Sequence, residues 1–223
     1  MIRLHRVGKV FASGPMKLPA LSDISFTIEK GEFVVLSGAS GAGKTTLLRL
    51  LYADEQVSDG EIEVAGFDLT RLRRREVPLL RRSLGIVFQD AKLLSGRTVF
   101  ENIAFVLRVL GTARRDITPR AFQALKAVGL SSRAQAYPAQ LSQGEAQRAA
   151  LARAIVKSPA LLLADEPTGN LDEAMAGEIL DLIKDISSRG TTVLFATHQA
   201  RLAAQLKRRI LRLEGGVLTK DEG

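Results

Sequence analysis

The order of apolar and polar residues predicts an alternating series of strands and helices. Near the start, Ile24, Phe26 and Ile28 alternate with polar residues, which is typical of a strand with one buried face. Uninterrupted apolar runs follow at 33–36 and 161–164, and such runs indicate parallel strands that are covered on both faces. We therefore expect an α/β fold with a buried sheet at its centre.

The middle of the chain, roughly residues 90–158, has a helical pattern throughout. Thr118–Pro119 predicts a helix start, because proline is tolerated in the first turn, and Gly129 predicts the end of that helix. Ser142 and Glu145 have the spacing of a capping box at the start of a further helix. We expect these residues to form a helical insert in the α/β core.

The last third of the chain returns to alternating elements. Helical sequence continues to Pro159, and an amphipathic helix is expected from about Leu171 to Ser188, before a strand at 192–196. No internal repeat, low-complexity segment or flexible linker interrupts this order. We expect one domain over residues 1–223.

Composition narrows the class of protein. The chain has 223 residues, of which 46% are hydrophobic and 25% charged, as in an ordinary globular domain. It contains no cysteine, which excludes disulfides, thiolate zinc sites and cysteine nucleophiles. The first residues alternate like a strand and carry charges, so we expect no signal peptide. A membrane span needs about 20 apolar residues, and Arg108 interrupts the apolar run at 103–110.

Positive charge is the clearest bias in the composition. The chain has 32 Lys and Arg residues against 24 Asp and Glu, which gives a formal net charge of +8. Arginines are concentrated between Arg71 and Arg82, and a second basic cluster lies between Lys207 and Arg212. This balance favours an anionic neighbour: a nucleotide, a nucleic acid or the inner face of a membrane. The alternative is that both clusters are solvated edges of helices or strands.

A glycine-rich segment directly after the strand at 33–36 predicts a phosphate-binding loop. It fits G-x-x-x-x-G-K-[ST] at every required position. We expect its backbone N–H groups and the next helix to bind phosphate oxygens, Lys44 to reach the β- and γ-phosphates, and Thr45 to place its hydroxyl on Mg²⁺. The nucleotide-binding residues of this segment are Gly38, Ala39, Ser40, Gly41, Ala42, Gly43, Lys44, Thr45 and Thr46.

Two adjacent carboxylates end the apolar strand at 161–164. Ligands of open α/β sheets bind at the carboxyl ends of the strands, where Asp165 and Glu166 lie. Asp165 is suited to coordinate Mg²⁺, and Glu166 to polarise an attacking water as general base. The metal and Lys44 would offset the repulsion between the two acids. The pattern therefore predicts a site that hydrolyses a nucleotide.

Between these two motifs, the residues Leu141–Ser142–Gln143–Gly144–Glu145 resemble the signature of the ATP-binding subunits of ABC transporters, usually L-S-G-G-Q. Other P-loop enzymes lack this element. The remaining motifs of that family are matched by the adenine-stacking aromatic Phe11, the Q-loop glutamine Gln89, the D-loop residue Asp172 and the switch histidine His198.

The resemblance implies a fold, cofactors and a mechanism. The fold would be an ABC-type P-loop NTPase core with an N-terminal antiparallel β subdomain and a helical signature subdomain. The cofactors would be ATP and Mg²⁺, with Thr45, Gln89 and Asp165 around the metal. ATP would join two copies into a homodimer, in which the signature of one copy contacts the γ-phosphate of the other. Glu166 and His198, with Lys44, would then be the catalytic residues.

Two positions depart from the family signature. Gln143 replaces a glycine and Glu145 replaces a glutamine. Gly144 and the Ser142 hydroxyl remain, so the resemblance still implies a contact with the γ-phosphate. A side chain at Gln143 could crowd this contact or add a hydrogen bond to it, and the sequence leaves both open.

Within the family, the run from Gln89 to Asn102 is similar to the bacterial cell-division subgroup. That subgroup pairs with a polytopic inner-membrane protein and controls cell-wall hydrolases. The resemblance implies a peripheral location on the cytoplasmic face of that membrane, with the helical insert contacting the partner. The ATPases of lipoprotein release and macrolide export share the segment 163–172 and are the alternative.

A soluble ATPase that handles nucleic acid is a second alternative, suggested by the net charge. It is disfavoured because the chain has no heptads for a coiled coil and only 5% aromatic residues for base stacking. We expect no nucleic-acid partner. Anionic lipid headgroups would account for the arginines between Arg71 and Arg82 as well as a nucleic acid would.

Overall fold

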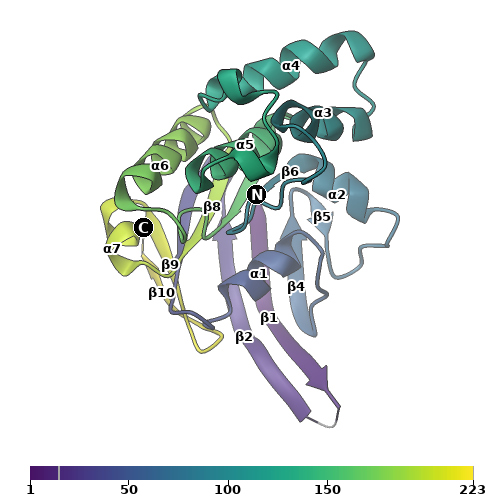
Figure 1. The fold of residues 1–223 in the computed structure, drawn as a ribbon. Helices are drawn as coiled ribbons and strands as arrows, with labels where there is room; N and C mark the ends of the chain where they lie inside the picture. Colours follow the sequence, from purple (N-terminus) through teal and green to yellow (C-terminus); the bar gives the residue numbers. More distant parts are fainter. Residues whose placement is uncertain (15, 223) are drawn as a thin grey trace.

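The computed structural model describes residues 1–14 and 16–222 of the chain (Figure 1). The strands are β1 (Ile2–Ser13), β2 (Met16–Ile28), β3 (Phe33–Ser37), β4 (Asp59–Val64), β5 (Phe67–Asp68), β6 (Leu84–Val87), β7 (Leu161–Asp165), β8 (Thr192–Thr197), β9 (Arg209–Glu214) and β10 (Val217–Glu222). The α-helices are α1 (Lys44–Leu51), α2 (Val77–Ser83), α3 (Val99–Val109), α4 (Arg114–Ala127), α5 (Gln143–Ile155), α6 (Glu173–Ser188) and α7 (Ala200–Gln205). Two short 3₁₀-helices are η1 (Ser131–Arg133) and η2 (Pro138–Gln140).

The strands form two sheets. One is antiparallel, with the order β2-β1-β4-β5, and the other has the order β10-β9-β3-β8-β7-β6. In the second sheet the strands from β9 to β6 are parallel, and only β10 is antiparallel to its neighbour. Helices α3 to α6 lie on the far side of the larger sheet from the antiparallel sheet (Figure 1). The predicted ABC-type fold, with an antiparallel subdomain and a helical subdomain, is confirmed.

The larger sheet is covered on both faces, as the uninterrupted apolar runs predict. Val34 and Leu36 of β3 pack into a core with α1 and the antiparallel sheet. Phe33 and Val35, whose side chains point the other way, pack into a second core with α3 to α7. Every residue of β3 is buried. This double burial holds the carboxyl ends of the strands in a rigid frame.

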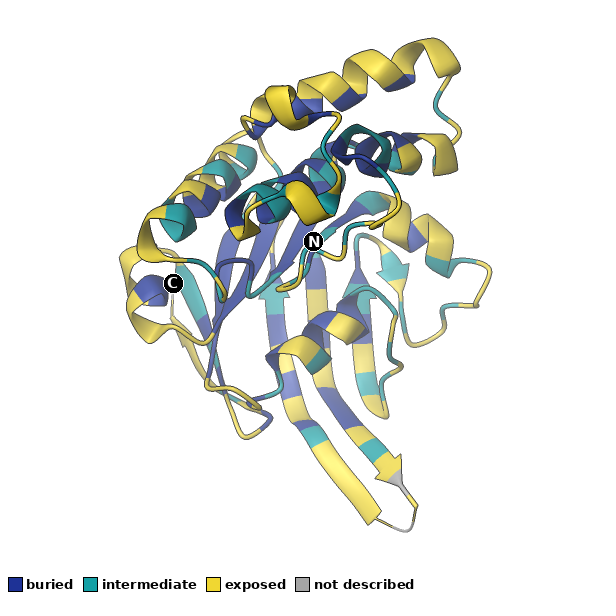
Figure 2. Cartoon of the chain, in the orientation of Figure 1, coloured by how far each residue is buried: buried dark blue, intermediate teal, exposed yellow. Residues whose placement is uncertain are grey.

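The antiparallel sheet is buried on one face only. Ile24, Phe26 and Ile28 of β2 are buried and alternate with more exposed residues, which confirms the expected strand. The far half of the β1–β2 hairpin extends beyond the rest of the molecule and is largely exposed (Figure 2). Its contacts with the phosphate loop, described below, come from the part of β2 nearer the body.

The middle of the chain is less helical than its pattern suggested. Residues 90–98 contain no helix, and residues 128–142 contain only η1 and η2. The expected start at Thr118–Pro119 is wrong, because α4 begins at Arg114 with Pro119 inside it. Pro119 is the sixth residue of the helix, so α4 forms without the hydrogen bond that an N–H at this position would donate to the Arg115 carbonyl. Gly129, with φ of 69°, lies just beyond the end of α4 as expected.

Two other helix boundaries differ from expectation. Helix α5 ends at Ile155 and does not reach Pro159, because Ser158 has φ of 52° and a residue before proline disfavours helix. Helix α6 begins at Glu173, since the Asp172 side chain caps it by accepting the Met175 N–H at 2.8 Å. In the described part of the chain, none of the helices has both the length and the apolarity that crossing a bilayer requires.

Candidate nucleotide-binding and hydrolysis site

The loop between β3 and α1 is held in shape by strands from distant parts of the chain. A Cβ at Gly38 would overlap the carbonyl oxygen of Leu213 on β9, and one at Gly43 would press against β2. The Gly216 N–H, from the turn between β9 and β10, donates to the Ala42 carbonyl at 3.1 Å. Close packing, as well as phosphate binding, therefore requires glycine at these positions.

The start of α1 presents unpaired N–H groups beside this loop. Its cap residue, Gly43, has φ of 104° and supplies no capping side chain, and the first turn carries no acidic residue. The first N–H groups of a helix lack intrahelical partners and carry the positive end of the helix dipole. This arrangement fits the phosphate groups of a nucleotide.

Two side chains, one from the phosphate loop and one from the sheet edge, contact the carboxylate of a third residue. Lys44 Nζ donates to the carbonyls of Gly38 and Ala39 at 2.8 and 3.0 Å, and it lies 3.2 Å from Glu166 Oε1. His198 Nδ1 lies 2.7 Å from Glu166 Oε2. Glu166 thus bridges a buried lysine and a partly exposed histidine. The structure brings together the three residues that the sequence proposed as catalytic.

The backbone at Glu166 is strained. Its φ is 47°, in the left-handed region that a residue with a Cβ adopts at a cost of about 1–3 kcal/mol. The Glu166 N–H donates to the Ala196 carbonyl of β8, and the Gly169 N–H donates to the Glu166 carbonyl, both at 3.0 Å. These bonds fix the turn after β7 and aim the carboxylate at Lys44 and His198.

A pocket of about 410 Å³ opens beside the phosphate loop, and Thr45, Gln89 and Asp165 line it. Thr45 Oγ1 donates to Asp165 Oδ1 at 3.3 Å, while Gln89 Nε2 donates to Asn170 Oδ1 at 3.3 Å. Burial raises the pKa of Asp165, and the hydrogen bond from Thr45 opposes this shift. A hydroxyl, a carboxylate and an amide oxygen are the hard oxygen ligands that Mg²⁺ takes together with nucleotide phosphates. The residues present therefore fit Mg²⁺.

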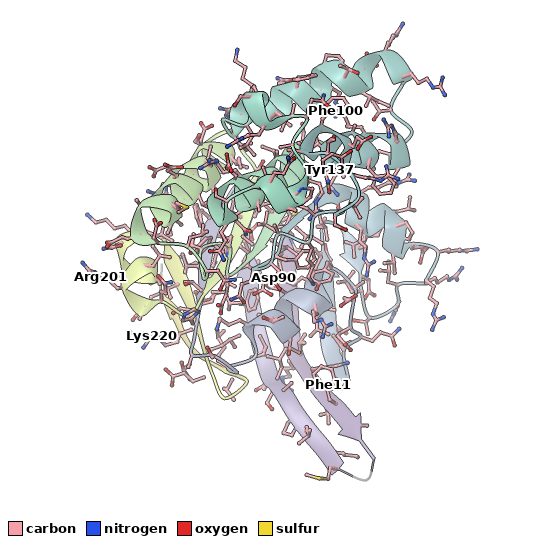
Figure 3. The ribbon with its side chains drawn as sticks, viewed as in Figure 1. Phe11, Asp90, Phe100, Tyr137, Arg201 and Lys220 are labelled. Atoms are coloured by element: carbon pink, nitrogen blue, oxygen red, sulfur yellow. The ribbon has the colours of Figure 1, made fainter. Side chains whose placement is uncertain are left out.

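Helix α5 holds the backbone on both sides of Gln89. Gln147 Nε2 donates to the Phe88 carbonyl at 2.9 Å. Arg153 donates to the carbonyls of residues 91–92 at 2.8 and 2.6 Å. Burial lowers the pKa of the Arg153 guanidinium. Asp90, next to Gln89, lies between α5 and α1 in Figure 3. This clamp was not predicted from the sequence, because a Gln and an Arg in an alanine-rich helix resemble surface residues.

The signature segment forms the predicted capping box at the start of α5. Ser142 Oγ accepts the Glu145 N–H at 3.2 Å, and Glu145 Oε2 accepts the Ser142 N–H at 2.8 Å. Glu145 also pairs with Arg133 Nε at 2.8 Å. The Ser142 N–H, and then Arg133, lower the pKa of Glu145. Both carboxylate oxygens of the glutamate that departs from the family signature thus accept hydrogen bonds within the chain.

The neighbours of the signature segment belong to α6. Gly144 packs against Met175, whose sulfur a Cβ at this position would overlap, and Asp172 caps the same helix. Gln143 is exposed. In the described part of the chain, no hydrogen bond joins residues 142–145 to the phosphate loop. The structure therefore does not bring the signature to the Glu166 cluster of its own chain.

Phe11 lies on the β1–β2 hairpin (Figure 3). The ammonium group of Lys9 lies 4.7 Å from the centre of its ring and is itself held by Glu55 Oε2 at 2.9 Å. Phe11 pairs with Leu18, a few residues along β2 from the part that contacts Gly43. The ring is only partly buried, so it has a face available for stacking.

Comparison with known proteins defines the class. The sequence model of the family described as ABC transporter matches residues 21–169, and the chain belongs to this family. It is an ABC-type ATPase. In a dimeric structure of the ATP-binding cassette MJ0796, in a post-hydrolysis state bound to ADP and Pi, the matching chain has a TM-score of 0.90 at 32% identity. The match covers 100% of this chain and 98% of that one.

Among curated proteins, the chain is similar to proteins named cell division ATP-binding protein FtsE. The protein from Streptococcus pneumoniae serotype 2 strain D39 is 44% identical over 222 residues, covering 100% of this chain and 95% of that protein. The Escherichia coli K12 protein is 47% identical over 218 residues, covering 98% and 97%. The Bacillus subtilis strain 168 protein is 42% identical over 222 residues, covering 100% and 96%.

Proposed function

We propose that this chain is the ATP-hydrolysing subunit of a membrane complex that acts in cell division. Two observations support the proposal. The carboxylate of Glu166 joins Lys44 and His198 beside a loop that fits phosphate. Relatives of nearly the same length are named as cell-division ATP-binding proteins. The first observation supports the hydrolysis of ATP, and the second supports the role in cell division.

The contacts of Lys44 suggest how ATP would activate the site. Lys44 Nζ is paired with Glu166 Oε1, and bound phosphate would compete for the same ammonium group. As Lys44 turns to the phosphate, Oε1 becomes free to accept a proton from water, while Oε2 stays with His198. Thr45, Gln89 and Asp165 would hold Mg²⁺, which offsets the phosphate charge when bound.

A second copy of the chain would complete the site. Ser142 accepts the capping hydrogen bond with its oxygen, so its O–H group is left to donate to a γ-phosphate. The start of α5 would add its positive end. Because the signature has no contact with its own phosphate loop, we propose that ATP binds between two copies, each giving residues 142–145 to the other.

The membrane partner would dock on a groove between α2 and α3. The groove has a volume of about 340 Å³, and its apolar floor includes Val77, Phe105 and Val109. Val109 and Phe105 are 61% and 38% exposed and line the same groove, and a contiguous exposed apolar surface of this kind favours a docking site. We propose that a polytopic protein of the FtsX type inserts a cytoplasmic helix here, which places this chain at the cytoplasmic face of the inner membrane.

The test uses Glu166→Gln, which keeps the size of the side chain but removes the base. We expect this variant to bind ATP, to hydrolyse it at least about a hundredfold more slowly, and to remain dimeric. Affinity capture with ATP from detergent-solubilised membranes should recover a multi-span protein together with a cell-wall hydrolase. The control is the double variant Lys44→Ala/Glu166→Gln, which should stay monomeric.

The outcomes separate the parts of the proposal. Wild-type turnover in Glu166→Gln would remove Glu166 as the base. Recovery of a solute or lipoprotein permease would keep the ATPase and replace the cell-division role. Recovery of nucleic acid alone would overturn the membrane role.

A further inference from the structure

We propose that the turn between β5 and α2 is a contact surface for anionic phospholipid headgroups. Its four arginines are Arg71, Arg73, Arg74 and Arg75, and we call it the arginine turn. The inference rests on the proposed function in one respect, because the membrane partner docked on the adjacent groove would bring the turn to the bilayer.

The arginine turn has a defined shape. Glu76 Oε2 accepts the Arg73 N–H at 2.9 Å, and the Glu76 N–H donates to the Arg73 carbonyl at 2.8 Å. Asp68 Oδ1 accepts the Thr70 N–H at 2.9 Å, which fixes the other end of the turn. Because the backbone is held at both ends, the arginines are displayed at set positions, and less entropy is lost when they bind.

The arginine side chains are exposed and nearly without partners. All four are exposed, and only Arg71 has a carboxylate nearby, that of Asp68 at 3.7 Å. Among residues 1–14 and 16–222, no carboxylate oxygen lies within 4.0 Å of the guanidinium nitrogens of Arg73, Arg74 or Arg75. The carboxylate of Glu76 is bonded to the backbone of the turn and makes no ion pair with a guanidinium, although its charge offsets one of the four arginines. The turn therefore keeps a net positive charge.

The position of the arginine turn would direct its positive charge toward the proposed membrane surface. The connection between β5 and α2 projects from one edge of the molecule, next to α2 (Figure 1). Helix α2 begins directly after it and provides Val77, Arg81 and Arg82 to the apolar groove. The groove and the arginine turn therefore lie at the same edge of the molecule. A helix of a membrane protein that occupies the groove would bring the turn close to the headgroups.

The chemistry favours lipid phosphates over other anions. A guanidinium binds a phosphate group through two parallel hydrogen bonds, and several of them together suit a surface with many phosphates. The turn contains no aromatic residue on which a nucleic-acid base could stack. Near an anionic leaflet each arginine strengthens binding by about fivefold.

The test measures sedimentation of the full chain with vesicles, in the absence of any membrane protein. One set of vesicles is phosphatidylcholine alone, and the other contains about one third phosphatidylglycerol. We expect wild-type protein to bind the second set only, and less as ionic strength rises. Neutralising the turn by Arg71→Gln, Arg73→Gln, Arg74→Gln and Arg75→Gln should weaken this binding at least about tenfold.

A matched control removes the same charge elsewhere. Four exposed residues outside this edge serve, changed as Lys30→Gln, Lys126→Gln, Arg201→Gln and Lys207→Gln. Arg201 lies on α7, on the opposite side of the molecule in Figure 3. Both variants should keep wild-type ATPase activity, which shows that they fold. The control should bind vesicles within about threefold of wild type, since a Debye length of about 10 Å makes the effect local.

Three results would overturn the proposal. In the first, wild-type protein does not bind the anionic vesicles. In the second, both variants lose binding equally, which would make net charge the cause. In the third, the turn variant keeps vesicle binding but no longer captures the membrane partner, which would make the turn a protein-docking surface. The vesicles contain no partner, so failure here leaves the capture experiment with Glu166→Gln to test the proposed function separately.

Discussion

The Glu166 cluster and the signature segment, which we propose act on the same nucleotide phosphates, differ in how complete they are within one chain. In the first, Lys44 and His198 already contact the same carboxylate, at 3.2 and 2.7 Å. In the second, Ser142 and Glu145 contact mainly each other and Arg133. The Glu166 cluster is assembled within a single chain. The signature segment also has a defined conformation, but it makes no hydrogen bond to the described phosphate loop of its own chain.

This difference distinguishes the two proposed tasks of the site, which are binding of the nucleotide and its hydrolysis. In the proposed mechanism, binding of a nucleotide would need only the loop and cluster of one copy, while closure would need the signature of another. Variants in the two regions should therefore separate binding from hydrolysis. The predictions below use this contrast, beginning with the largest effect.

Lys44→Ala removes the side-chain ammonium group that contacts the carbonyls of the phosphate loop and Glu166. We expect the affinity for ATP to fall by at least about a hundredfold, since a preorganised charged donor is lost. Equilibrium binding of a fluorescent ATP analogue measures this. Lys184→Ala, an exposed lysine on α6, is the control and should bind normally. Retained affinity in Lys44→Ala would contradict the role of the loop.

Ser142→Asp tests the other region. Aspartate is as good an N-cap as serine, so α5 should stay intact, but its charge would repel a γ-phosphate from a second copy. We expect ATP binding within about twofold of wild type and hydrolysis reduced at least about tenfold. In the Glu166→Gln background, sedimentation should show loss of the ATP-dependent dimer. A normal dimer would mean that the signature does not face the nucleotide.

Arg153→Leu tests whether α5 links the two regions through Gln89. The change leaves the Ala91 carbonyl, which is partly buried, and the Lys92 carbonyl, which is exposed, without their donor, and this costs about 1 kcal/mol of stability. If the clamp positions Gln89, the Mg²⁺ concentration for half-maximal hydrolysis should rise about tenfold, because groups that orient a ligand affect metal affinity. Affinity for ATP measured without Mg²⁺ should not change.

Arg153→Lys is the matched control for this clamp, because it keeps a cation that can reach one of the two carbonyls. It should recover part of the Mg²⁺ response. A loss of stability with an unchanged Mg²⁺ response would give Arg153 a structural role only.

Glu145→Gln restores the family residue and should have the smallest effect. It keeps the capping acceptor but loses the ion pair with Arg133, so stability should fall by less than about 1 kcal/mol at neutral pH. The pKa of Glu145 is lowered from 4.5 in the folded chain, so its contribution is present above that pH and lost as the pH falls through the lowered value. Melting temperatures of the two proteins should therefore converge below pH 4.5.

Local patterns predicted the parts of the site that depend on local order. The phosphate loop follows from glycines and a lysine at fixed spacing, and the box at Ser142 and Glu145 from a four-residue rule. The clamp by Arg153 was not predictable, because it joins α5 to a loop 61 and 62 residues away. The start of α4 was misjudged because proline is typical of the first turn of a helix, whereas Pro119 lies in the second turn of α4.

The contacts of the second basic cluster, between Lys207 and Arg212, were also not predictable from local patterns. Its sequence allowed either a solvated edge or an anionic partner. Arg209 instead joins three segments, through Asp221 on β10, Glu32 before β3, and the Thr27 carbonyl on β2. The pKa of this guanidinium is raised by Asp221, even though burial opposes the shift. Charge counts along the chain could not reveal partners that lie on other strands.

The contact between Gly216 and the phosphate loop has a consequence for synthesis of the protein. Gly216 donates to Ala42 and accepts from the Ser22 N–H at 2.8 Å, so it ties the loop to β2. A ribosome makes residues 22 and 42 long before residue 216. The loop therefore gains these two hydrogen bonds only when the hairpin of β9 and β10 emerges, and a nascent chain lacking this hairpin should not retain ATP. Nucleotide competence is thus coupled to synthesis of this hairpin.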